Sequence, residues 1–148
     1  MPTLVDTIKA SVKEAMRAKD KQRLGTLRLI QAEFKRIEVD ERIDIDDARA
    51  IAIMDKMLKQ RRDSAEQYQN AGRDELAEQE LSEIAVIGEF LPEPLSADAI
   101  DELIKAAIEA SGASGMQAMG AVMAAIRPQV QGRADMAEVS KQVKTLLS

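Results

Sequence analysis

Apolar residues recur at intervals of three and four along most of this 148-residue chain, and this spacing constrains the fold more than any other feature. Leu4, Ile8, Val12 and Met16 follow one another at intervals of four, which places them on one face of a helix. The composition disfavours β-strands, because the chain has only 1 Tyr and 2 Phe and its β-branched residues do not alternate with polar ones. The sequence therefore predicts an all-α fold.

The first part of the chain predicts four helices. Thr3 and Asp20 are suitable N-caps for the first two, and the carboxylates within 44–47 favour the start of a third. The third helix should end near Gly72 and the fourth should begin at Asp74, so that these two form an αα-hairpin. The expected apolar stripes of the second to fourth helices are Leu27, Ile30, Phe34 and Ile37; Ile51, Met54, Leu58 and Ala65; and Leu76, Ile84, Ile87 and Leu91.

Two prolines, Pro92 and Pro94, mark a boundary because they prevent the fourth helix from continuing. We therefore predict an N-terminal helical domain at residues 1–94 and a small three-helix tail domain at residues 95–148. The tail helices are expected to have Ser96, Ser114 and Asp135 as N-caps, with stripes at Ile100, Leu103, Ile104 and Ile108; Met116, Met119, Val122, Met123 and Ile126; and Val139, Val143 and Leu146.

The chain contains neither cysteine nor histidine, and this limits its chemistry. Disulfides, thiolate or imidazole metal sites and histidine-based catalytic arrangements are excluded. Residues 1–6 show neither a signal peptide nor a membrane span. We expect a cytoplasmic protein that acts through binding, without a cofactor, a metal ion, a membrane partner or catalytic residues of its own.

Two short patterns have both a chemical and a structural interpretation. The Ser- and Gly-rich segment 111–115 is similar to the loops of amidases, but a helix linker with Ser114 as N-cap accounts for it equally. Glu80 and Glu83 have a spacing at which carboxylates can hold Mg²⁺, but such pairs are typical of solvated helix faces. We favour the structural interpretation of both.

Three basic residues of the third helix, Arg49, Lys56 and Lys59, lie within about 80° of one another and roughly opposite its apolar stripe. They predict an outward basic strip that is able to contact nucleic acid. Asp55 and Asp63 are interleaved with it, which favours a solvated helix surface whose charges pair with one another. Both interpretations remain open.

A second basic group lies near the C-terminus and surrounds a glycine. Backbone N–H groups near Gly132 and the start of the last helix, with Arg133 beside them, are suited to receive a phosphate. The alternative is a glycine turn followed by the Asp135 cap. The net charge of -5 argues against loose coating of nucleic acid, but a local patch can still bind RNA. The members of this group are Arg127, Gly132, Arg133, Lys141 and Lys144.

Several motifs in order resemble the GatB/YqeY family across almost the whole chain. The tail is similar to that of GatB, a subunit of the glutamine-dependent aminoacyl-tRNA amidotransferase. Two positions depart from the GatB pattern: Gln131 stands where that pattern often has a basic residue, and Met136 stands where it often has a small residue or Pro. The motifs that resemble stand-alone YqeY proteins are Lys59-Gln60-Arg61-Arg62-Asp63-Ser64, Ala71-Gly72-Arg73, Leu76, Glu80, Glu83-Ile84 and Leu91-Pro92; those of the tail are Met119-Gly120-Ala121-Val122-Met123, Gly132-Arg133-Ala134-Asp135 and Val139.

The resemblance implies a tRNA-associated accessory protein, because the tail of the full amidotransferase helps to hold tRNA and the catalytic parts of that enzyme have no counterpart here. We expect the C-terminal basic group to make the phosphate contacts, assisted by the strip Arg49, Lys56 and Lys59. One alternative is a protein–protein adaptor whose tail docks on a translation-related partner. Another is carbon–nitrogen ligase activity that uses glutamine as amide donor on aminoacyl-tRNA.

Overall fold

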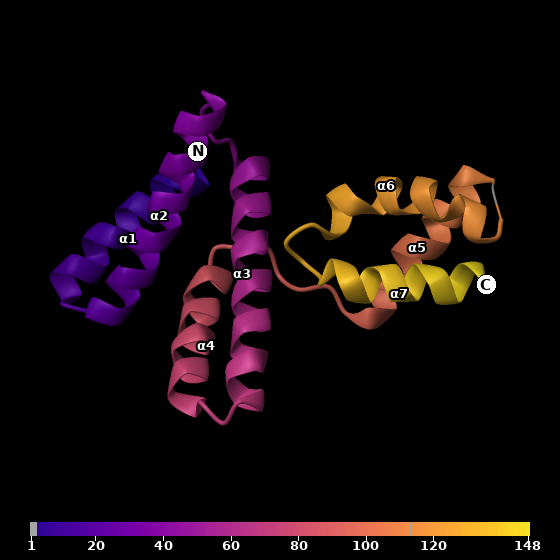
Figure 1. Cartoon of the computed structure of the whole chain (residues 1–148). Helices are drawn as coiled ribbons and strands as arrows, with labels where there is room; N and C mark the ends of the chain where they lie inside the picture. The colour runs from indigo at the N-terminus through magenta and orange to yellow at the C-terminus, as the bar shows by residue number, and fades with distance from the viewer. Residues whose placement is uncertain (1–2, 113) are drawn as a thin grey trace. The chain divides into compact units, whose positions relative to one another are not determined.

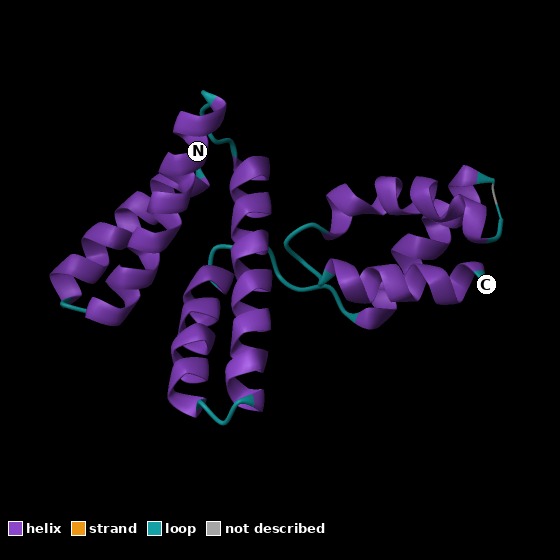
Figure 2. Ribbon diagram, in the orientation of Figure 1, coloured by secondary structure: helices purple, strands orange, loops and turns teal. Residues whose placement is uncertain are grey.

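The computed structural model describes residues 3–112 and 114–148, and all the regular secondary structure in these ranges is helical (Figures 1 and 2). The predicted all-α fold is confirmed. The expectations that fall on residues 1, 2 and 113, within the N-terminal segment and the Ser- and Gly-rich segment, lie outside the described residues. The elements are α1 (Leu4–Ala18), α2 (Lys21–Glu41), α3 (Asp47–Asn70), α4 (Asp74–Gly88), α5 (Ala97–Ser111), the short 3-10 helix η1 (Met116–Ala118), α6 (Met119–Val130) and α7 (Met136–Leu147).

The chain divides into two compact units, one ending at Leu91 and the other comprising Pro92–Ser148. In the first unit, α1 and α2 run side by side, as do α3 and α4 (Figure 1). Thr3 and Asp6 form a reciprocal capping box at the start of α1, and the Asp20 carboxylate caps α2, as the sequence predicted. The α3–α4 hairpin is also confirmed. It turns at Gly72, whose φ of 71° suits glycine.

The core of the first unit lies where the two helix pairs meet. Its fully buried side chains come from all four helices and include Ile8, Leu27, Ile30, Met54 and Ile87. One polar contact fixes α1 on α3, since the Leu4 N–H donates to the Asp47 carboxylate at 2.8 Å. The stripe predicted for α2 is buried in full.

The second unit packs α5, α6 and α7 around its own core. Ile104, Val122, Ile126, Val139 and Val143 are fully buried. Ser96 caps α5 and Asp135 caps α7, as predicted. The predicted boundary between domains, after Pro94, stays a prediction.

Several expectations for individual residues were wrong. Met16 and Leu76, expected in apolar stripes, are 52% and 43% exposed, whereas Ile53 and Met57, which the predicted stripe of α3 omits, are buried. That stripe is too narrow because α3 is covered by α1, α2 and α4.

Two expected helix ends also differ. The fourth helix ends at Gly88, before Leu91, although Leu91 still packs against the core. Ser114 does not cap the sixth helix: Gly115, at a φ of 72°, leads into η1, and no side chain caps η1 or α6.

Candidate functional site

The turn between α6 and α7 is built around Gly132, which has a φ of 75°. The N–H groups of Arg133 and Ala134 both donate to the Val130 carbonyl, at 2.8 and 3.1 Å. Asp135 then accepts the Ala137 N–H at 3.0 Å and begins α7. The glycine turn and aspartate cap are therefore present, and two N–H groups expected near a phosphate are engaged within the turn.

Arg133 fastens the start of the second unit to this turn. Its Nε donates to the Glu93 carbonyl at 2.9 Å, and its own carbonyl accepts the Leu95 N–H at 2.8 Å. A half-buried arginine thus holds the proline-containing segment in place. Its Nη atoms make no hydrogen bond or ion pair with the residues described.

The remaining cations of the C-terminal group are exposed. Arg127 lies in the last turn of α6, while Lys141 and Lys144 lie on α7. Lys141 is 3.6 Å from Glu138 in a solvated pair, which contributes little energy. Neither Arg127 nor Lys144 forms an ion pair within the part of the chain that the structure describes.

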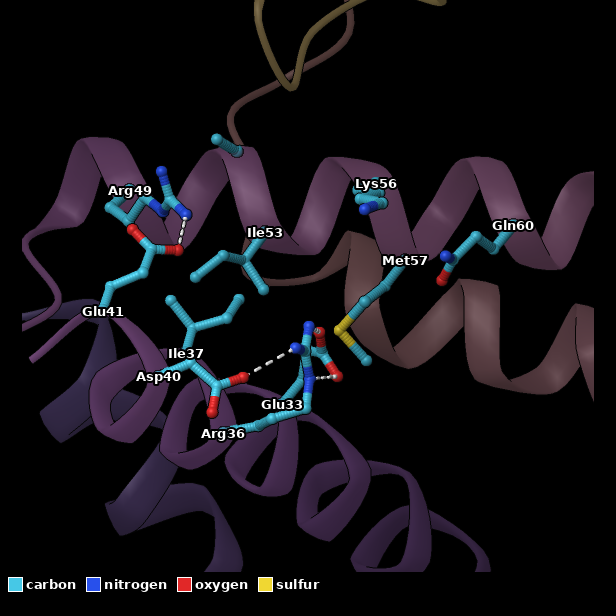
Figure 3. A pocket seen from close by; sticks show the side chains of 11 residues that line it. Glu33, Arg36, Ile37, Asp40, Glu41, Arg49, Ile53, Lys56, Met57 and Gln60 are labelled. Atoms are coloured by element: carbon cyan, nitrogen blue, oxygen red, sulfur yellow. Dashed lines mark hydrogen bonds and ion pairs between the residues drawn. The ribbon is translucent and has the colours of Figure 1, made fainter.

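The predicted strip on α3 has a different setting from the one expected. Arg49 and Lys56 line a cleft of about 360 Å³ between α3 and α2, whereas Lys59 is exposed and outside the lining (Figure 3). The opposite wall comes from α2. The lining residues are Glu33, Arg36, Ile37, Asp40, Glu41, Arg49, Ala52, Ile53, Lys56, Met57 and Gln60.

Carboxylates from α2 neutralise most of the positive charge in this cleft. Arg49 pairs with Glu41 at 2.5 Å, and Arg36 pairs with Glu33 at 2.5 Å and Asp40 at 3.2 Å. The hydrogen bond from Arg36 holds the pKa of Glu33 below its usual value, although partial burial acts in the opposite direction. The sequence pattern predicted acidic partners within α3, whereas the acid that pairs with Arg49 is Glu41 of α2.

Three residues of the motifs that resemble YqeY proteins meet between α3 and α4. Arg61 and Glu83 form an ion pair, and Glu80 lies within their electrostatic reach. Burial, followed by repulsion from Glu83, raises the pKa of Glu80. The expectation that Glu83 lies on a solvated face was wrong, because this residue is only 9% exposed. The sequence did contain a signal for this burial, because Glu83 lies four residues before Ile87 and therefore on the same helix face as that buried residue.

Within residues 3–112 and 114–148, no group of three or more acidic side chains is arranged to hold a metal ion. In the same ranges, the apolar stretch of every helix is too short or too polar to span a membrane.

The profile of the family described as Yqey-like protein matches residues 5–147. The chain belongs to the YqeY-like family. This YqeY-like chain is also similar to a protein named altered inheritance of mitochondria protein 41, mitochondrial, from Pyrenophora tritici-repentis, with 32% identity over 143 residues, which cover 95% of the chain and 78% of the relative. The protein of the same name from Lachancea thermotolerans is 34% identical over 97 residues, which cover 64% of the chain and 52% of the relative.

Proposed function

We propose that this YqeY-like chain is a noncatalytic, tRNA-associated accessory protein that contacts phosphates through its C-terminal unit. The observation that carries the proposal is the pair of exposed cations Arg127 and Lys144, which no described acidic residue neutralises. Such cations are available to contact a phosphate and would release counterions on binding RNA. The resemblance of the tail to that of the amidotransferase subunit supports tRNA as the partner.

The other members of the basic group have more limited roles in this proposal. Lys141 adds a third exposed charge beside its solvated pair with Glu138. Arg133 and Gly132 shape the turn, and the Nη atoms of Arg133 remain available as donors to a phosphate. Of the strip on α3, Lys59 is retained as an auxiliary contact, because Arg49 and Lys56 lie among carboxylates.

Binding of fluorescently labelled tRNA to the full chain at low salt tests this proposal. We expect the double variant Arg127→Ala/Lys144→Ala to weaken binding by at least about tenfold, as expected for two lost charge-assisted contacts. Lys105→Ala is the matched control, because it removes an exposed cation of α5 outside the basic group. Wild-type binding no tighter than that of an unrelated acidic helical protein would refute the proposal.

A protein–protein adaptor is the second candidate, and the exposure of Met116 in the C-terminal unit favours it. Met119, Met123 and Met136 are only partly buried against the same core, and such flexible side chains suit an adaptable partner surface. Affinity capture with the chain would then recover a partner protein in stoichiometric amount, and nuclease treatment would not release this partner. Loss of every captured protein on nuclease treatment would argue against this role.

We assign no carbon–nitrogen ligase turnover to the chain by itself, and glutamine hydrolysis by the purified protein would contradict this assignment.

The subcellular compartment of the chain is a separate question. The sequence favours the cytoplasm, whereas the relatives' names place those proteins in mitochondria. Subcellular fractionation of the native protein distinguishes the two locations.

A further inference from the structure

The cleft between α2 and α3 combines an apolar floor with two charged walls (Figure 3). Ile37, Ile53 and Met57 form the floor, and each is buried. The volume of the cleft, about 360 Å³, is within the range of sites that hold small molecules. A few polar groups around an apolar surface are also typical of such sites.

The ion pairs that line this cleft leave one cation without a close partner. Arg36 bonds to both Glu33 and Asp40, and Arg49 bonds to Glu41. Lys56 makes neither a hydrogen bond nor an ion pair with the described residues, and it acts on Glu33 only at longer range. An ammonium donor is therefore available on the α3 wall, with the Gln60 amide one turn further along the same helix.

The opposite wall has spare acceptors. Glu33 and Asp40 share the single guanidinium of Arg36, so their carboxylates retain lone pairs that Arg36 does not use. The acidic and basic residues of the lining are equal in number, so the cleft carries no net positive charge that would attract a polyanion such as RNA. The arrangement instead complements a ligand that carries both signs of charge and an apolar body.

We infer that the cleft binds a small zwitterion of the α-amino acid class with an apolar side chain. Its carboxylate accepts hydrogen bonds from Lys56 Nζ and the Gln60 amide, and its ammonium group donates to Glu33, which lines the facing wall. The side chain of the ligand packs over the floor formed by Ile37 and Ile53. This inference is independent of the proposed tRNA binding, whose main contacts lie in the other unit.

Titration of the ¹⁵N-labelled full chain with L-leucine, followed by NMR, tests the inference. The NMR signals of backbone amides in α2 and α3 around the cleft should change position as leucine is added, and this change should saturate at millimolar leucine. N-acetyl-L-leucine lacks the ammonium group and L-leucinamide lacks the carboxylate, so each should bind about tenfold more weakly than leucine.

Matched variants locate the two charged contacts. Lys56→Gln should weaken leucine binding about tenfold, whereas Lys59→Gln, on the same helix but outside the lining, should leave it unchanged. Glu33→Gln and the exposed control Glu66→Gln, outside the lining, form the equivalent pair for the ammonium group.

Absence of saturable shifts in the wild-type chain would overturn the inference. Equal binding of leucine and N-acetyl-L-leucine would also overturn it, because the cleft would then be an anion site. Leucine binding by Lys56→Gln that matches the wild type would have the same consequence.

Discussion

Arg61 on α3 and Glu83 on α4 form a largely buried ion pair, with Nε of the guanidinium 3.5 Å from Oε2 of the carboxylate. The guanidinium is also held by a hydrogen bond from Nη1 to the Met57 carbonyl at 3.2 Å. The buried Nε makes no hydrogen bond with a described group, so the contact with Glu83 is mainly electrostatic. Removal of water from both charges makes the pair sensitive to the loss of either partner.

Arg61→Met should destabilise the chain by about 3 kcal/mol, because it leaves the Glu83 carboxylate buried without its counter-charge. The double variant Arg61→Met/Glu83→Leu should recover most of this loss. Urea denaturation of both variants measures the free energies of unfolding. The exposed neighbour Arg62→Met is the control. A double variant less stable than Arg61→Met would contradict this account of the pair.

Glu80→Gln should stabilise the chain at pH 7 by up to about 0.5 kcal/mol. Because burial raises the pKa of Glu80 in the folded chain, folding favours its protonated form. The destabilising effect of the carboxylate is therefore absent well below pH 4.5 and develops as the pH rises through the folded-state pKa.

Chemical denaturation of this variant at pH 7 and at acid pH measures the effect. The gain in the free energy of unfolding should disappear at acid pH. Glu78→Gln, an exposed substitution on the same helix, provides the comparison. A gain of equal size at both pH values would show that the charge of Glu80 is not responsible.

The C-terminal unit should fold by itself as a fragment that begins at Pro92. Its core draws on residues from Ile100 to Leu147, so the fragment retains a complete set of packing partners. With 57 residues in this unit, we expect a cooperative but weak thermal transition, which circular dichroism measures.

A fragment that begins at Leu95, the predicted domain boundary, should be less stable by about 1 kcal/mol. It lacks the Glu93 carbonyl that accepts the hydrogen bond from Arg133. Equal stability of the two fragments would show that this contact contributes nothing, and the absence of a cooperative transition in both would contradict the proposed domain division.

Local features of the fold could be predicted from the sequence. The caps at Thr3, Asp20, Ser96 and Asp135 involve groups within three residues of one another, so sequence order alone specifies them. Ser114 was the exception, because the positive φ of Gly115 takes the chain into a 3-10 turn instead of a side-chain cap.

The charged contacts between helices could not be predicted in the same way. Whether Arg49 meets Glu41, or Arg61 meets Glu83, depends on how separate helices pack, and helical periodicity does not determine that packing. The sequence therefore identified Arg49 and Lys56 as neighbours on α3 but missed the acidic wall opposite them. In the C-terminal unit, it identified Arg133 but missed its hydrogen bond to Glu93.

The salt dependence of tRNA binding tests the central proposal most directly. The logarithm of the association constant should fall linearly with the logarithm of salt concentration, and Arg127→Ala/Lys144→Ala should reduce this slope by about 2, one for each phosphate contact removed. Lys105→Ala should leave it unchanged. An identical slope for the wild type and the double variant would show that these two cations do not contact the phosphates and would contradict the proposed function.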